Sequence, residues 1–213
     1  MTDILGKIFS SPARVKIMRL FLLNGDQCFE KSDIVTRSKV SPSAATRELS
    51  LLSTATFIKK SSFIKTTTVK KGKKQVTKKK RVSGWCLNIK FPYQRALSEL
   101  LIDAESFEGD DLAKLIRPHG KIKLILAAGV FTQDPDSRLD LLIVGDHLKR
   151  PAIERTIRVL ESEIGKELAY AIFETDEFLY RANMYDKLVR DVVDFPHMRV
   201  INQGILDQIP HIK

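Results

Sequence analysis

The chain has 213 residues, of which 43% are hydrophobic, and a formal net charge of +10. This length suits one or two domains, and the apolar content is sufficient to bury real cores. No window approaches the roughly 18 continuous apolar residues of a membrane helix. The first residues, "MTDILGKIFSS", contain an acid and only a short apolar patch, unlike a secretory signal. We therefore expect a cytoplasmic protein that has no membrane partner.

The cysteines and histidines give no sign of a metal site. Cys28 and Cys86 are far apart in the sequence and form no CxxC pair. We expect them to be reduced, partly buried thiols with neither a disulfide nor a metal role. The four histidines are scattered without the spacing of metal ligands. No metal and no cofactor are predicted.

The positive charge is concentrated in one segment. Residues 59–81 contain 11 Lys and Arg and no acidic residue, whereas the rest of the chain has 25 basic and 26 acidic residues. The first 95 residues carry a net charge of +16, and the remainder carries −6. This asymmetry indicates that the N-terminal part binds a polyanion.

Two helices are predicted before residue 40. The segment "SPARVKIMRLFLL" places Ile17, Leu20 and Phe21 at helical spacing, and its proline falls in the first turn, where it is tolerated. After the break at "NGDQ", the segment "KSDIVTRS" predicts a short second helix with Ser32 as its N-cap. A tight turn through Lys39 follows.

A third helix is predicted to begin at Ser41-Pro42, where a capping residue precedes a proline. Its apolar residues recur at helical spacing and are expected to face inward, which leaves a polar outer face. The inward set is Ala45, Leu49 and Leu52, and the outward set is Ser43, Thr46, Arg47 and Ser50. An arginine can donate two bonds to a guanine edge, and short hydroxyl side chains can contact bases or phosphates. The pattern predicts a helix-turn-helix; the alternative is three core helices with a solvated polar face.

A β-hairpin is predicted after the third helix. Phe63–Val69 and Arg81–Asn88 have strand character, and a lysine-rich tip at residues 70–74 contains the turn glycine. Such a hairpin is the wing of a winged helix, whose lysines bind phosphates and release counterions. The predicted phosphate-binding residues are Lys59, Lys60, Lys70, Lys71, Lys73, Lys74, Lys78, Lys79, Lys80 and Arg81. A flexible basic loop is the alternative. RNA binding also fits the charge, but no aromatic-interleaved stacking surface favours it.

Residues 11–101 resemble a bacterial or archaeal winged-helix transcriptional regulator of the ArsR-like kind. The similarity rests on "SPARVKIMRLFLL", "VSPSAATRELSLL" and "GWCLNIKFPYQRALSELL". It implies the fold and the DNA-binding role. It does not imply metal sensing, because the cysteine and histidine motifs of the metal-sensing members are missing.

The C-terminal part predicts an α/β unit of about a hundred residues. Strands are expected in "KIKLILAAGV", "LDLLIV", "KELAYAIFE" and "MRVIN". Helices are expected in "PAIERTIRVLESEIG" and over residues 175–193. The first of these helices places Ile153, Ile157, Leu160 and Ile164 on one face.

This layout resembles the small nucleotidyltransferase domain. In that family a glycine-serine pair ends the first strand, and an Asp-x-Asp pair opens the second. Here Gly129 matches the glycine, but Val130 stands in place of the serine. In "SRLDLLIVGD", Ser137 and Asp140 match, but Arg138 occupies the position of the first aspartate.

The substitution at Arg138 argues against transfer chemistry. Residues two apart on a strand share a face, so an Asp pair would be about 6.6 Å apart and could converge on one metal. A guanidinium cannot coordinate a cation, and we expect Arg138 to bridge to Asp140 or to Glu174, the candidate third carboxylate. No catalytic residue is therefore predicted. The domain could serve dimerisation or effector sensing, could bind a nucleotide through Arg138 and Gly129 without chemistry, or could be a packing scaffold.

The predicted fold class is α+β, with a winged helix-turn-helix at residues 1–90, connecting helices at 91–118, and a nucleotidyltransferase-like domain at 119–213. The predicted function is a transcriptional regulator, not an enzyme, that binds double-stranded DNA as a homodimer. A nucleotide or small-molecule effector is an optional partner. The alternatives are an active nucleotidyltransferase of the toxin–antitoxin type with a nucleic-acid-binding N-terminal part, and a non-specific nucleoid protein.

Overall fold

The computed structural model describes residues 4–71, 74–103, 109–134 and 136–209. The chain is a mixed α and β protein that divides into two compact units. The N-terminal unit comprises residues 2–105 with 161–166, and the C-terminal unit comprises residues 106–160 with 167–213. Each unit has its own sheet and is described by itself.

The helices of the N-terminal unit start at local capping signals. They are α1 (Ile4–Ile8), α2 (Pro12–Leu23), α3 (Lys31–Ser38) and α4 (Pro42–Thr54). The predicted serine cap and first-turn proline of α4 are confirmed, and α2, predicted with Pro12 in its first turn, also begins after a serine cap. The hydroxyl of Ser11 accepts from the backbone N–H of Arg14, and that of Ser41 accepts from Ala44, each at 3.2 Å.

The predicted cap of α3 is wrong. The N-cap is Glu30 and not Ser32, and the backbone N–H of Glu30 donates to the Asp33 carboxylate at 3.2 Å. This carboxylate three residues into the helix satisfies an N–H group that the helix itself leaves without a partner. The helix ends at Lys39, which adopts a left-handed conformation with φ of 48°.

The core of the N-terminal unit contains the apolar residues predicted to face inward. Ile17, Leu20 and Phe21 of α2 are at most 1% exposed. Ala45, Leu49 and Leu52 of α4 are at most 3% exposed and fall one helical turn apart. Helical periodicity therefore fixed which face of each helix is buried.

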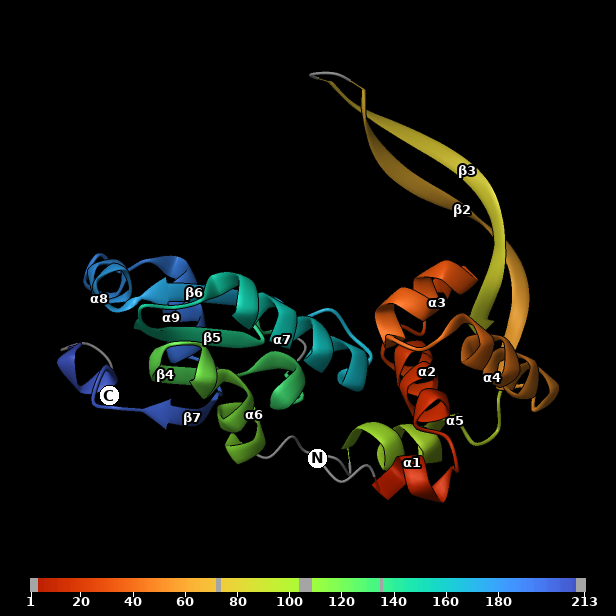
Figure 1. The fold of residues 1–213 in the computed structure, drawn as a ribbon, viewed down its shortest axis with the longest axis horizontal. Helices are drawn as coiled ribbons and strands as arrows, with labels where there is room; N and C mark the ends of the chain where they lie inside the picture. The colour runs from red at the N-terminus through yellow and green to blue at the C-terminus, as the bar shows by residue number, and fades with distance from the viewer. Residues whose placement is uncertain (1–3, 72–73, 104–108, 135, 210–213) are drawn as a thin grey trace. The chain divides into compact units, whose positions relative to one another are not determined.

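The hairpin extends well beyond the two predicted strand segments. It is formed by β2 (Ile58–Lys71) and β3 (Lys74–Leu87), and β3 also pairs with the two-residue strand β1 (Cys28–Phe29) in the order β1-β3-β2. Figure 1 shows the two long strands projecting past helices α2, α3 and α4. Gly84 permits the pairing with β1, because a Cβ atom there would lie 2.1 Å from the carbonyl oxygen of Phe29.

The expectation of reduced cysteines is also wrong. Cys28 of β1 lies directly opposite Cys86 of β3, and the two form a disulfide. Their separation of 58 residues gave no hint of this pairing, which depends on the long-range register of the sheet.

The segment after the hairpin, where the sequence predicts connecting helices over residues 91–118, begins with irregular helix. This first part consists of α5 (Gln94–Ser98) and a π-helical turn (Glu99–Asp103). Leu101 is buried, and its carbonyl oxygen accepts a hydrogen bond of 2.8 Å from Nε of Arg19. Leu100 is 42% exposed.

The C-terminal unit is built on a four-stranded sheet in the order β6-β5-β4-β7. All four strands were predicted: β4 (Lys121–Ala127), β5 (Leu141–Asp146), β6 (Tyr170–Glu174) and β7 (Met198–Asn202). β5 runs parallel to β6 and antiparallel to β4, and β4 is antiparallel to β7. The sheet therefore mixes both kinds of pairing, with β4 and β5 at its centre.

The helices of this unit match the predictions except for one break. They are α6 (Gly109–Ile116), in the segment predicted as connecting helices, α7 (Arg150–Ile164), of which residues 150–160 belong to this unit, α8 (Thr175–Asn183) and α9 (Lys187–Val193). The predicted face of α7, with Ile153, Ile157, Leu160 and Ile164, is at most 4% exposed. The single helix expected over residues 175–193 is interrupted at Tyr185, which has a φ of 55°.

Candidate nucleic-acid interface

The outer face of α4 has the polar surface that the sequence predicts. Ser43, Thr46, Arg47 and Ser50 are all exposed. The Thr46 hydroxyl donates to the carbonyl oxygen of Pro42 at 2.8 Å, and the Ser43 hydroxyl is 3.1 Å from that of Ser41. Both oxygens retain lone pairs that can accept from an outside donor.

A buried carboxylate beneath this face was missed by the sequence analysis. Glu48 of α4 is fully buried and accepts from the Ser11 hydroxyl at 2.9 Å and from Nε of Arg14 at 2.8 Å. It also pairs with Nε of Arg47 at 3.2 Å. Burial raises the pKa of Glu48, but the hydrogen bonds from Arg14 and Ser11 outweigh it and leave that pKa below its usual value.

Glu48 therefore joins α4 to the start of α2 and steadies Arg47 at the surface. The Arg47 side chain is 71% exposed, so its guanidinium remains open to solvent while its Nε is engaged. A glutamate inside an apolar stripe was the available signal, because such a residue is buried only when it is paired.

The hairpin presents exposed cations on its described part. Lys59, Lys60, Lys79, Lys80 and Arg81 are exposed. Because side chains alternate along a strand, Lys79 and Arg81 lie on one face of β3 and Lys80 lies on the other. For Lys70, Lys71, Lys74 and Lys78 the structure describes only the backbone, and Lys73 lies outside the described residues.

One basic residue of the segment has an internal partner. Nζ of Lys65 on β2 lies 2.7 Å from the Glu30 carboxylate and 2.6 Å from that of Asp33. The hydrogen bonds to Asp33 and then to Glu30 raise the pKa of Lys65 above its usual value. Lys65 therefore links the hairpin to α3 and is not available to an external anion.

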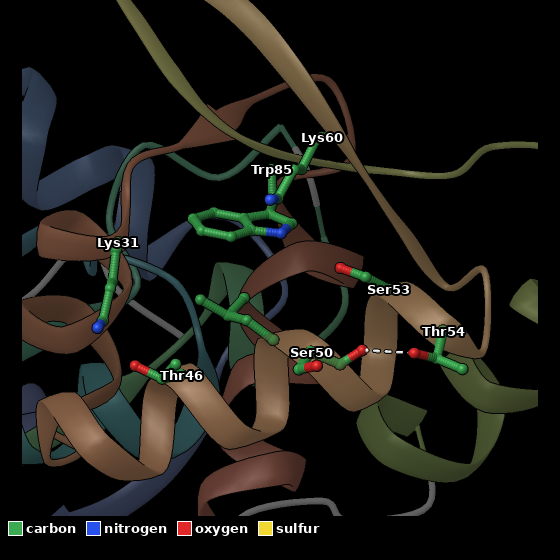
Figure 2. Close-up of a pocket in the computed structure, with 8 residues that line it drawn as sticks. Lys31, Thr46, Ser50, Ser53, Thr54, Lys60 and Trp85 are labelled. Carbon is green, nitrogen blue, oxygen red and sulfur yellow. Dashed lines mark hydrogen bonds between the residues drawn. The ribbon is translucent and has the colours of Figure 1, made fainter.

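A hollow with a volume of about 310 Å³ lies between α4 and the base of the hairpin. We call it the α4 hollow. Figure 2 shows Thr46, Ser50, Ser53 and Thr54 along α4, with Trp85 and Lys60 of the hairpin across from them. Its lining consists of Lys31, Thr46, Leu49, Ser50, Ser53, Thr54, Lys60 and Trp85.

Lys31, Ser53 and Trp85 line the α4 hollow but were not predicted from the sequence as site residues. Trp85 is the only tryptophan in the chain. It is half-buried and lies directly opposite Lys60 in the hairpin register, with the lysine ammonium 6.0 Å from its ring centroid. A tryptophan in a strand beside a lysine-rich segment was a usable signal for an aromatic platform.

In the C-terminal unit, the carboxylate of Asp140 is hydrogen-bonded to the protein backbone. The residue is 8% exposed; its Oδ1 accepts from the backbone N–H of Val130, and its Oδ2 accepts from that of Ala169, each at 2.8 Å. Gly129 has a φ of 54°, and a Cβ atom there would lie 2.3 Å from Oδ1 of Asp140. The carboxylate thus holds the turn after β4.

The expected bridge from Arg138 to Asp140 or Glu174 is wrong. Nε of Arg138 lies 3.0 Å from Oδ2 of Asp191 on α9. Glu174 accepts instead from the backbone N–H of Leu148 at 3.2 Å. The Ser137 hydroxyl donates to the carbonyl oxygen of Leu139 at 2.7 Å. Of the five residues predicted for this site, the structure brings Gly129 and Asp140 into contact, while Ser137, Arg138 and Glu174 each have another partner.

Neither a metal-ion site nor a membrane-spanning helix occurs among the described residues. Within residues 4–71, 74–103, 109–134 and 136–209, no three His, Cys, Asp or Glu side chains gather in a way that could hold a metal ion. In the same ranges, no helix combines the length and the apolar character needed to cross a membrane.

Comparison with known proteins identifies no relative: no family model, no curated protein and no solved structure matches the chain. The proposals below therefore depend on the geometry and charge of the chain itself.

Proposed function

We propose that the chain is a DNA-binding transcriptional regulator with a winged helix-turn-helix in its N-terminal unit. The observation that carries this proposal is the exposed polar face of α4 in the same unit as a long hairpin with exposed Lys and Arg. The order α2, α3, α4 and then a hairpin follows the helix-turn-helix-and-wing arrangement.

In this proposal α4 enters the major groove, and Arg47 reads base edges. Glu48 engages Nε of Arg47, which leaves the two terminal nitrogens to donate together to O6 and N7 of a guanine. Ser43, Thr46 and Ser50 contact neighbouring bases or phosphates. The fixed Nε reduces the rotamer freedom that the arginine would lose on binding.

The hairpin lies along the sugar-phosphate backbone and supplies affinity that is independent of sequence. Lys65 is excluded from this role by its pairing with α3, so the contacts come from the other cations of residues 59–81. If about six of them bind phosphates, the logarithm of the binding constant falls with the logarithm of the salt concentration at a slope of about −5.

We assign the C-terminal unit to dimerisation or effector sensing rather than to chemistry. Both carboxylate oxygens of Asp140 accept hydrogen bonds from backbone N–H groups, and Arg138 is paired with Asp191. A two-fold protein suits a two-fold operator, which supports a homodimer. Magnesium-dependent consumption of labelled ATP would contradict this assignment and favour the active nucleotidyltransferase.

The test is a binding titration of the promoter DNA beside the protein's own gene against random DNA, at two salt concentrations. The test variant replaces Lys78, Lys79 and Lys80 of the hairpin with serine. The matched control replaces three exposed lysines of the C-terminal unit, Lys114, Lys149 and Lys187, with serine and so has the same net charge.

Preference for the promoter, with a salt slope that is less negative by about 2.7 in the hairpin variant and unchanged in the control variant, supports the proposal. Equal, weak binding to both DNAs indicates a non-specific or RNA-directed protein instead. Equal loss of slope in the two variants shows that only net charge matters and contradicts the role assigned to the hairpin.

A further inference from the structure

The α4 hollow combines an aromatic wall with two lysine side chains. Lys31 comes from the start of α3, and Lys60 and Trp85 come from a cross-strand pair of the hairpin (Figure 2). Neither lysine has a hydrogen bond or an ion pair with any residue that the structure describes. Lys65, on the same strand as Lys60, has two carboxylate partners. The hollow therefore has positive charge that no carboxylate of the described residues pairs with.

A buried hydroxyl in the lining also has no partner. The oxygen of Ser53 is buried and makes no hydrogen bond to any described residue. By contrast, Thr54 donates to the Ser50 carbonyl oxygen at 3.0 Å, and Thr46 donates to that of Pro42 at 2.8 Å. Because this oxygen is covered by protein atoms, it is not a contact for a ligand in the hollow, and the lysines and the indole are the features that select one.

We propose that the α4 hollow binds a small planar aromatic molecule that carries an acidic group. The ring packs against the indole of Trp85 beside Lys60, and the acidic group pairs with the ammonium group of Lys31. Charge-assisted bonds to a carboxylate or phosphate are about twice as strong as neutral ones. A volume of about 310 Å³ is at the lower end for ligand pockets and suits one or two fused rings with a short acidic substituent.

Occupation of the hollow would compete with DNA. Thr46 and Ser50 belong both to its lining and to the face of α4 that we assign to the major groove. A bound anion would also place negative charge beside the phosphates of the DNA. This competition rests on the proposed function, whereas binding of the ligand to the hollow does not.

The first experiment uses the full chain without DNA. Because Trp85 is the only tryptophan, its fluorescence reports the hollow directly. Adenosine monophosphate and nicotinate, which do not emit in the tryptophan band, are titrated as acidic probes, with adenosine and nicotinamide as their uncharged counterparts. We expect a saturable change for at least one acidic probe, and binding at least tenfold weaker for its uncharged counterpart.

Two variants test the geometry. Lys31→Gln removes a charge from the lining and should weaken binding of the acidic probe about tenfold. Lys90→Gln is the matched control, because Lys90 is exposed in the same unit and does not line the hollow, so the affinity should not change.

Three outcomes overturn the proposal: no saturable change with any probe, equal affinity for charged and uncharged probes, or equal affinities in Lys31→Gln and the original chain. A change seen only with a single-stranded oligonucleotide assigns the hollow to the nucleic-acid surface and also refutes a small ligand. DNA competition is measured afterwards. Probe binding without competition leaves the ligand site established and contradicts only the link to the proposed function.

Discussion

Loss of the Cys28–Cys86 disulfide should destabilise the N-terminal unit. The bond closes a loop over a sequence separation of 58 residues, which contains α3, α4, β2 and nearly all of β3. In the chain-entropy model, a crosslink over a loop of this length lowers the entropy of the unfolded chain by about 14 cal/mol/K, which is about 4 kcal/mol at 25 °C. Measured values for single disulfides are typically about 2–4 kcal/mol.

The folded state also loses support when the bond is broken. β1 has two residues and pairs only with β3 among the described strands. Phe29, next to Cys28, is 4% exposed and packs edge-on against Phe21 in the core. We therefore expect reduction to lower the free energy of unfolding by about 2–4 kcal/mol and to leave the core packed.

The assay is guanidinium unfolding followed by the fluorescence of Trp85, which lies in the unit concerned. With a slope of about 3 kcal/mol per molar guanidinium, the midpoint should fall by roughly 1 M when reductant is present. The variant with serine at both Cys28 and Cys86 should show the lower midpoint with or without reductant. Equal midpoints for the original chain in oxidising and reducing buffer would refute the reasoning.

Three further predictions concern single side chains. Because the fold lowers the pKa of Glu48, this residue stabilises the protein above its unfolded pKa of about 4.3, and the stabilisation is lost as the pH falls through its folded pKa. Glu48→Gln should reduce this loss of stability in unfolding measurements between pH 6 and 3. The raised pKa of Lys65 has the opposite sign, so its contribution is present below about pH 10.4 and is lost as pH rises through the folded value; Lys65→Gln should remove that alkaline loss. Asp140→Ala should cost about 2–4 kcal/mol in chemical denaturation, because two backbone N–H groups lose their acceptor. Arg138→Ala removes one ion pair whose arginine side chain is 57% exposed and should cost less, about 1 kcal/mol.

The helices of the N-terminal unit were predictable because their signals are local. Ser11-Pro12 and Ser41-Pro42 each place a cap beside a proline, and the apolar residues that follow recur at helical spacing. The buried face of α4 follows from those two features alone. The misassigned cap of α3 shows the limit, since Glu30 and Ser32 both carry an oxygen that can cap a helix, and local sequence did not separate them.

The sheet of this unit was only partly predictable, because pairing depends on residues far apart in the chain. Strand propensity located the middle of the hairpin, but the ladder continues through the lysine-rich residues to Lys71 and Lys74. The Cys28–Cys86 bond requires the register of β1 on β3, and β1 is too short to give a sequence signal. The α4 hollow depends on the same register, since it brings Trp85 opposite Lys60.

The predicted site in the C-terminal unit failed for a geometric reason. The prediction placed Arg138 and Asp140 on one face of a strand, whereas β5 begins only at Leu141. The break at Tyr185 divides the expected helix into α8 and α9, and α9 carries Asp191, the partner of Arg138. Because the sequence predicts one long helix over residues 175–193, it gives no indication that the Asp191 carboxylate lies beside Arg138.

The contacts of the N-terminal unit explain how a long basic hairpin can hold a fixed direction relative to α4. Lys65 ties β2 to Glu30 and Asp33, and the disulfide ties β3 to β1 at the hairpin base. Glu48 ties α4 to α2 through Ser11 and Arg14. The strand pairing continues past Lys65 to residue 71, so the lysine-rich end extends from an anchored base. If α4 and the hairpin bind one DNA site together, these ties reduce the conformational entropy lost on binding, because the two elements are already oriented.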